Sequence, residues 1–86
     1  MIKLYTLDNK FIKETYELPP NFTGIVEWYP SSNSWWFEGK IHRLDGPAKI
    51  WEGVTDTVNL WYIYGVMCTK EQHALLVDIM KLKGLT

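Results

Sequence analysis

The pattern W-x-x-x-G occurs twice in this chain, as WWFEG at residues 35–39 and as WYIYG at residues 61–65. Each copy follows a run rich in apolar residues, 24–29 or 46–52, and a polar loop separates the run from the copy. Strand, loop and strand in both places predict two β-hairpins in tandem, because a repeated supersecondary unit leaves a repeated pattern in the sequence. Residues 24–65 are therefore expected to form two aromatic hairpins within a sheet.

Residues 1–18 predict a further hairpin at the start of the chain. Each end of this segment is rich in β-branched and aromatic residues, and the turn-forming sequence D-N-K lies between them. The two consecutive prolines at 19–20 remove backbone donors, so strand pairing is expected to stop there. With 86 residues, the chain 1–86 is expected to be a single domain with one small core.

Residues 69–84 change to a helical pattern. Thr69 and Gln72 have the spacing of a capping box at a helix start. The apolar residues that follow recur at spacings of three and four, and the sheet is expected to bury this stripe: Leu75, Leu76, Ile79, Met80 and Leu82. The predicted fold class is α+β, a twisted antiparallel sheet of tandem hairpins with about five or six strands and one C-terminal α-helix covering a sheet face.

Strand alternation divides the rings of the two aromatic hairpins between the two faces of the sheet. One face is purely apolar and is the expected core: Trp35, Phe37, Trp61 and Ile63. The other face carries rings with polar groups and is the expected contact surface: Trp36, Tyr62 and Tyr64, with Trp28 and Trp51 as further candidates.

The stretch between the two hairpins, GKIHRLDGPAKIW, holds a histidine, an arginine and an aspartate within four positions. A catalytic interpretation makes His42 a general base oriented by Asp45, with Arg43 binding an anion. A structural interpretation makes Asp45 and Gly46 a turn and Pro47 the start of a strand, while Arg43 pairs with a carboxylate and His42 bonds a backbone carbonyl. The structural corner is favoured, because no serine, cysteine or second histidine motif supports catalysis.

The charge balance argues against nucleic acid as a partner. Nine basic and ten acidic residues give a formal net charge of −1, so the chain as a whole does not attract phosphate. Exposed rings on a sheet can stack on unpaired bases. However, Glu27, Glu38 and Glu52 lie within the aromatic hairpins and disfavour such a groove.

Metal and cofactor sites are not expected. His42, His73 and the single Cys68 do not have zinc-ligand spacing, and no glycine-rich phosphate loop is present. A single cysteine fits a reducing compartment. No run of about 18 apolar residues and no signal peptide is apparent, so a cytoplasmic location without a membrane is expected.

The residues WWFEGKIHRLDGPAKIW, followed by LWYIYG and TKEQ, resemble the tandem W-Y-x-N-G-K-x-H-R-x-D-G-P-A repeats of small phage-encoded and bacterial proteins, which are loosely similar to MORN repeats. The resemblance covers residue 24 to about residue 72. This chain keeps one complete copy of the H-R-x-D-G-P-A signature, and the flanking copies are degraded. A phage protein that binds a host protein is what this resemblance implies.

The expected function is that of a non-enzymatic protein that binds and inhibits a host protein. The resemblance alone implies that this host protein is an antiviral defence component, in the manner of anti-CRISPR proteins. Aromatic anchors on a rigid scaffold supply affinity in protein interfaces. The candidate partner-binding residues are Trp36, Tyr62, Tyr64, Trp28, Trp51 and Arg43. The alternatives are a protein that sequesters a small ligand or nucleotide, with a homodimer as a further expectation, then a single-stranded nucleic-acid binder, and last an enzyme built on His42 and Asp45.

Overall fold

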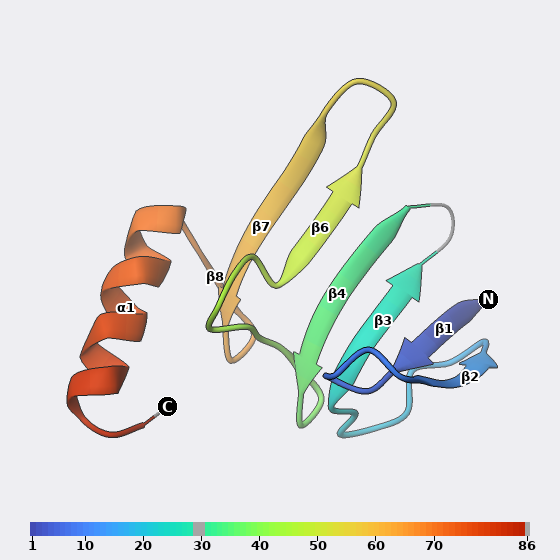
Figure 1. Cartoon of the computed structure of the whole chain (residues 1–86), viewed down its shortest axis with the longest axis horizontal. Coiled ribbons are helices and arrows are strands. Elements are labelled where there is room, and N and C mark those ends of the chain that lie inside the picture. Colours follow the sequence, from blue (N-terminus) through green and yellow to red (C-terminus); the bar gives the residue numbers. More distant parts are fainter. Residues whose placement is uncertain (29–30, 86) are drawn as a thin grey trace.

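A computed structural model of the chain describes residues 1–28 and 31–85 and has the predicted α+β class. Figure 1 shows a twisted antiparallel sheet with one C-terminal helix beside it. Tyr29, the predicted end of a strand, lies outside the described residues, as do Pro30 and Thr86. The elements are β1 (Ile2–Tyr5), β2 (Phe11–Thr15), β3 (Gly24–Trp28), β4 (Ser32–Phe37), β5 (Lys40–Ile41), β6 (Lys49–Glu52), β7 (Thr57–Ile63), β8 (Val66–Cys68) and α1 (Lys70–Leu82).

The described residues form more strands than predicted because the W-x-x-x-G pattern does not end its hairpin. Glu38 and Gly39 both have positive φ, 49° and 81°, and Tyr64 and Gly65 repeat this with 45° and 83°. Two consecutive residues with positive φ form the tight two-residue turn that joins antiparallel strands. The chain therefore turns back twice more, into β5 after β4 and into β8 after β7.

The sheet has the strand order β2-β1-β3-β4-β6-β7-β8, with β5 paired to β4. Its buried core is formed by Ile2 and Leu4 of β1 and Val26 of β3. Leu18 and Phe22, from the connection between β2 and β3, pack against these residues together with Trp36. The core lies in the N-terminal half of the sheet, and Trp36, a predicted contact residue, is half-buried against it.

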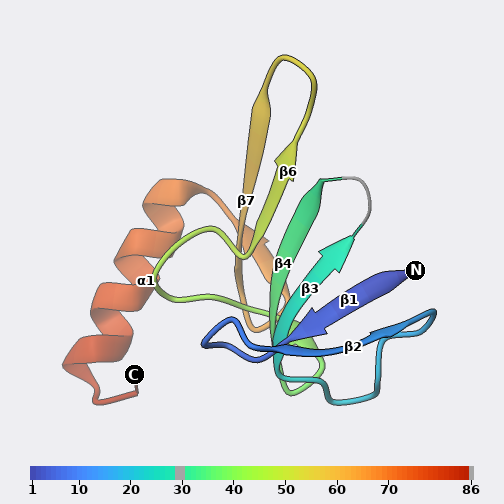
Figure 2. The same ribbon diagram turned by 45° about the vertical axis from the view of Figure 1, so that its right-hand side comes forward.

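The helix α1 begins as predicted. The Thr69 side chain accepts from the Gln72 backbone N–H, and the Gln72 side chain accepts from the Thr69 N–H, which completes the capping box. Figures 1 and 2 show α1 beside the β7 side of the sheet. Within residues 1–28 and 31–85, no helix has the length and apolar character needed to cross a membrane.

The prediction that the apolar stripe of α1 is buried is wrong for four of its five residues, since only Met80 is half-buried. The helix turns His73 and Val77 towards the body of the protein, and these are its buried residues. Leu75 and Leu82 are 62% and 88% exposed. Because only Thr69 separates β8 from α1, the connection leaves little freedom to rotate the helix. The side chain of His73 therefore meets the sheet where the leucines were expected.

Candidate functional site

The HRLDGPA stretch forms a loop between β5 and β6, two strands that pair with the same neighbour, β4. β5 and β6 both pair with β4, at Trp36 with Ile41 and at Ser34 with Lys49. Between these pairs, Trp35 accepts at its carbonyl from the His42 N–H (2.9 Å) and donates its own N–H to the Ala48 carbonyl (2.8 Å). Residues 43–47 thus form a loop that interrupts the strand paired with β4. We call these residues the corner loop.

Arg43 holds the corner loop closed. Its Nε donates to Asp45 Oδ1 at 3.0 Å, and its Nη1 donates to the Pro47 carbonyl at 3.2 Å. Its guanidinium carbon lies 3.9 Å from the ring centroid of Trp35, a cation–π contact. A Cβ at Gly46 would lie 3.0 Å from the same carbon, so glycine leaves room for the arginine. The bond from Arg43 holds the pKa of the Asp45 carboxyl below its usual range.

His42 contacts Tyr64 and does not contact Asp45. Its Nδ1 accepts from the Tyr64 backbone N–H at 2.8 Å, and the two rings stack with centroids 4.0 Å apart. The structure therefore differs from the expected bond to a carbonyl, since Nδ1 acts as an acceptor. Burial, with a smaller contribution from the nearby His73, lowers the pKa of His42. The carboxylate that would orient a general base is bonded to Arg43 instead.

His73 connects α1 to the corner loop, a role that the sequence analysis missed. Its Nε2 lies 2.6 Å from the carbonyl oxygen of Arg43, so this nitrogen carries a proton and donates. The ring is 3% exposed and packs beside Trp61, with centroids 4.9 Å apart. The available signal was the spacing of His73 and Val77, which lie four residues apart on the side of α1 away from Leu75 and Leu82.

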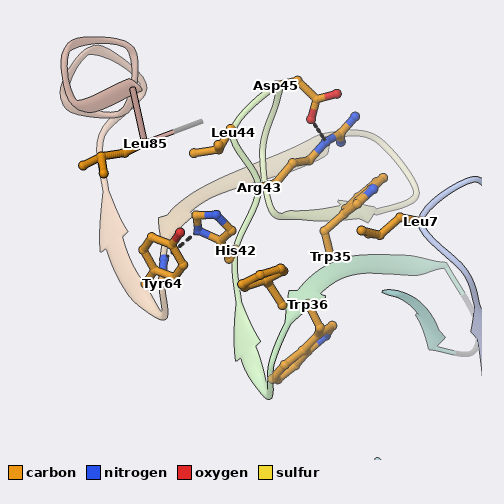
Figure 3. Close-up of a pocket in the computed structure, with 10 residues that line it drawn as sticks. Leu7, Trp35, Trp36, His42, Arg43, Leu44, Asp45, Tyr64 and Leu85 are labelled. Atoms are coloured by element: carbon orange, nitrogen blue, oxygen red, sulfur yellow. Dashed lines mark hydrogen bonds and ion pairs between the residues drawn. The ribbon is translucent and has the colours of Figure 1, made fainter. Parts of the chain in front are cut away.

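A pocket of about 410 Å³ lies between the corner loop, the end of β4 and the C-terminal segment (Figure 3). We call it the corner pocket. Leu7 from the first hairpin turn and Leu85 after α1 complete its apolar walls. The lining residues are Leu7, Trp35, Trp36, Phe37, His42, Arg43, Leu44, Asp45, Tyr64 and Leu85. Among the polar groups at its wall, the Arg43 guanidinium, the Asp45 carboxylate and the His42 Nδ1 already have partners within the chain.

A second feature lies at the other end of the sheet. Trp28 is paired with Ser32, Ser32 with Trp51, and Trp51 with Val58, so the four residues form one row across β3, β4, β6 and β7. Directly paired residues point to the same face of a sheet. Trp28, Trp51 and Val58 are 42%, 47% and 38% exposed, whereas Ser32 is buried and its Oγ has no partner among the described residues. We call these four residues the tryptophan row.

The structure divides the predicted contact residues among four places. Trp28 and Trp51 lie in the tryptophan row, and Tyr64 and Arg43 line the corner pocket. Trp36 packs against the core, with its Nε1 donating to Ser34 Oγ at 2.8 Å. Tyr62 is half-buried in β7.

The expected apolar core face is only partly covered. Phe37 is exposed, whereas Trp35, Trp61 and Ile63 are half-buried. Alternation placed Trp35 and Trp36 on opposite faces, but the face that carries Trp36 is the one that the β2–β3 connection covers. The face with Trp35 is covered in part by the corner loop and α1.

No protein-family model, curated protein or solved structure matches this chain. The similarity to the phage and bacterial repeat proteins therefore stays a prediction.

Proposed function

We propose that this chain is a non-enzymatic binding protein whose tryptophan row contacts a partner protein. The observation that carries the proposal is the register of Trp28, Ser32 and Trp51, which sets two partly exposed indoles on either side of a small residue. Neighbouring strands lie about 4.8 Å apart, so the indoles project from positions about 10 Å apart. A partner side chain can enter between two such rings, and tryptophan is among the residues that contribute most to interface affinity.

The scaffold supports this role because the row lies on strands and not on flexible loops. Ser31 Oγ donates to the Glu52 carbonyl, and the Glu52 N–H donates to the Ser31 carbonyl at 2.9 Å, which ties β4 to β6 beside the row. A site on rigid elements loses little conformational entropy when a partner binds. The row is therefore ordered before binding.

The resemblance of the repeats supports a finer proposal for the partner. On this resemblance alone, we propose that the partner is a host protein that the chain inhibits, such as a component of antiviral defence. The host cytoplasm is the corresponding place of action.

Affinity capture from host cells tests the proposal. The tagged wild-type chain is compared with Trp28→Ala/Trp51→Ala and with Tyr16→Ala, which removes an aromatic side chain that is 82% exposed outside the row. We expect one stoichiometric partner with the wild type and with Tyr16→Ala, and its loss with the double variant. Equal capture by all three proteins would reject the tryptophan row as the contact surface.

A second function, sequestering a small ligand, is favoured by the corner pocket. Its volume of about 410 Å³ is within the range of small-molecule sites, and most of its wall is apolar. Native mass spectrometry of the purified chain should then show a retained mass that disappears in Leu44→Trp, which fills the pocket. A wild-type chain that carries no added mass would leave this second function without support.

A further inference from the structure

The helix α1 has an apolar face that the other residues of 1–28 and 31–85 leave open. We call it the outer helix face, and it consists of Leu75, Leu76, Ile79 and Leu82. All four side chains are at least 39% exposed. His73 and Val77, which contact the body of the protein, lie on the other side of the helix. A small domain rarely leaves a leucine stripe of this kind in water.

The whole chain exposes more surface than a compact monomer of its mass. Its accessible area is 6064 Å², whereas a folded monomer of 10.1 kDa is expected to expose about 5,300 Å². The radius of gyration is 13.4 Å, against about 12 Å expected for this length. The excess area, about 800 Å², equals what one partner contributes to a protein interface of standard size. Burying one interface of ordinary size would therefore reduce the accessible area of the chain to the value expected for its mass.

The charges on the outer helix face match a second copy of the same helix. Glu71, Leu75 and Ile79 of α1 and Lys83 at its C-cap follow one another at intervals of four residues, so each lies next to the previous one in a line that winds gradually around the helix. The line reads acidic, apolar, apolar, basic. When two such helices pack antiparallel, Glu71 of each lies opposite Lys83 of the other, and Leu75 lies opposite Ile79. In this arrangement the partly positive N-terminus of each helix also lies beside the partly negative C-terminus of the other, which is favourable.

We propose that the outer helix face is the interface of a two-fold symmetric homodimer in which the two α1 helices pack antiparallel. A two-fold interface uses the same surface on both subunits and must be complementary to itself, as this line of residues is. The proposal is independent of the function proposed above. Val58, in the tryptophan row, and Trp61, which contacts His73, lie three residues apart in β7 and so point to opposite faces of the sheet.

Sedimentation equilibrium over a wide range of protein concentration tests the dimer. The matched variants are Leu75→Gln/Ile79→Gln, in which glutamine preserves helix propensity, and Val54→Gln, which changes a fully exposed apolar residue in the β6–β7 loop. We expect a dimer mass for the wild type and for Val54→Gln, and a monomer mass with unchanged circular dichroism for the double variant. A wild type that stays monomeric at every concentration, or a double variant that still dimerises, overturns the proposal.

Crosslinking tests the antiparallel direction. In a Cys68→Ser background, Glu71→Cys/Lys83→Cys should form a covalent dimer rapidly under mild oxidation. Glu71→Cys alone should not, because the two positions 71 of an antiparallel pair lie about 18 Å apart along the helices. Efficient crosslinking of the single variant, or none with the pair, overturns the antiparallel arrangement.

Discussion

Replacing His73 with alanine should release α1 from the corner loop. The substitution removes the donor that lies 2.6 Å from the Arg43 carbonyl, and it removes the ring that packs against Trp61. An unsatisfied carbonyl costs about 1–3 kcal/mol. The lost ring contact adds about 0.5–1.5 kcal/mol. Together these terms predict a loss of about 1.5–4.5 kcal/mol, a large part of the roughly 4–13 kcal/mol expected for a domain of this length.

Amide hydrogen exchange shows which part of the chain loses this stability. Val77 is the other buried residue of α1, so the helix should undock before the sheet unfolds. We expect exchange in α1 to accelerate about 30-fold or more, which corresponds to about 2 kcal/mol, while Leu4 and Val26 in the core keep most of their protection.

His73→Gln is the matched control, because its side-chain amide can still donate a hydrogen bond. We expect it to keep part of the helix protection that His73→Ala loses. Unchanged exchange of α1 in His73→Ala would refute the idea that this histidine holds the helix. Equal losses in both variants would show that ring packing, and not the hydrogen bond, provides the attachment.

Three further predictions concern single residues. The pKa of His42 is lower in the folded state than in the unfolded chain, so the unfolded chain binds a proton at higher pH. The free energy of unfolding should therefore fall as the pH drops below about 6.5. Urea unfolding should show this, and His42→Asn, which keeps an acceptor for the Tyr64 N–H, should weaken the pH dependence; an unchanged dependence would contradict the assignment. Gly24→Ala should not fold by circular dichroism, since its Cβ would lie 2.3 Å from the Tyr5 carbonyl oxygen at a φ of 151°, and a normal spectrum would refute this. Trp36→Ala should cost about 3–5 kcal/mol in urea unfolding, and a loss below about 1 kcal/mol would show that Trp36 is not part of the core.

Local patterns in the sequence carried much of the architecture. The capping box of Thr69 and Gln72 and the tandem hairpins depend on residues close together in the chain, so the start of α1 and the α+β class could be predicted. The sequence did not predict the two tight turns, although a signal was present: the second residue of each turn is a glycine, Gly39 or Gly65. Glu38 and Tyr64 adopt positive φ there, which hides the turn from a search for Asn-Gly or Asp-Gly.

The tryptophan row and the corner pocket depend on pairing between distant segments. Trp28 and Trp51 meet on either side of Ser32 only through the register of β3, β4 and β6. The corner pocket needs Leu7 and Leu85 from opposite ends of the chain. Strand alternation indicates which residues share a face, but it does not indicate which strands become neighbours.

The sequence by itself determined the hairpin units, the helix start and the division of the rings into two sets. Only the tertiary structure decided which set is covered: Leu18 and Phe22 pack on the face with Trp36, and His73 turns the helix so that Leu75 faces outward. The physical reason is that alternation and capping are set by backbone geometry over a few residues. Burial is set by the long-range contacts that give the largest gain in apolar packing and hydrogen bonding for the chain as a whole.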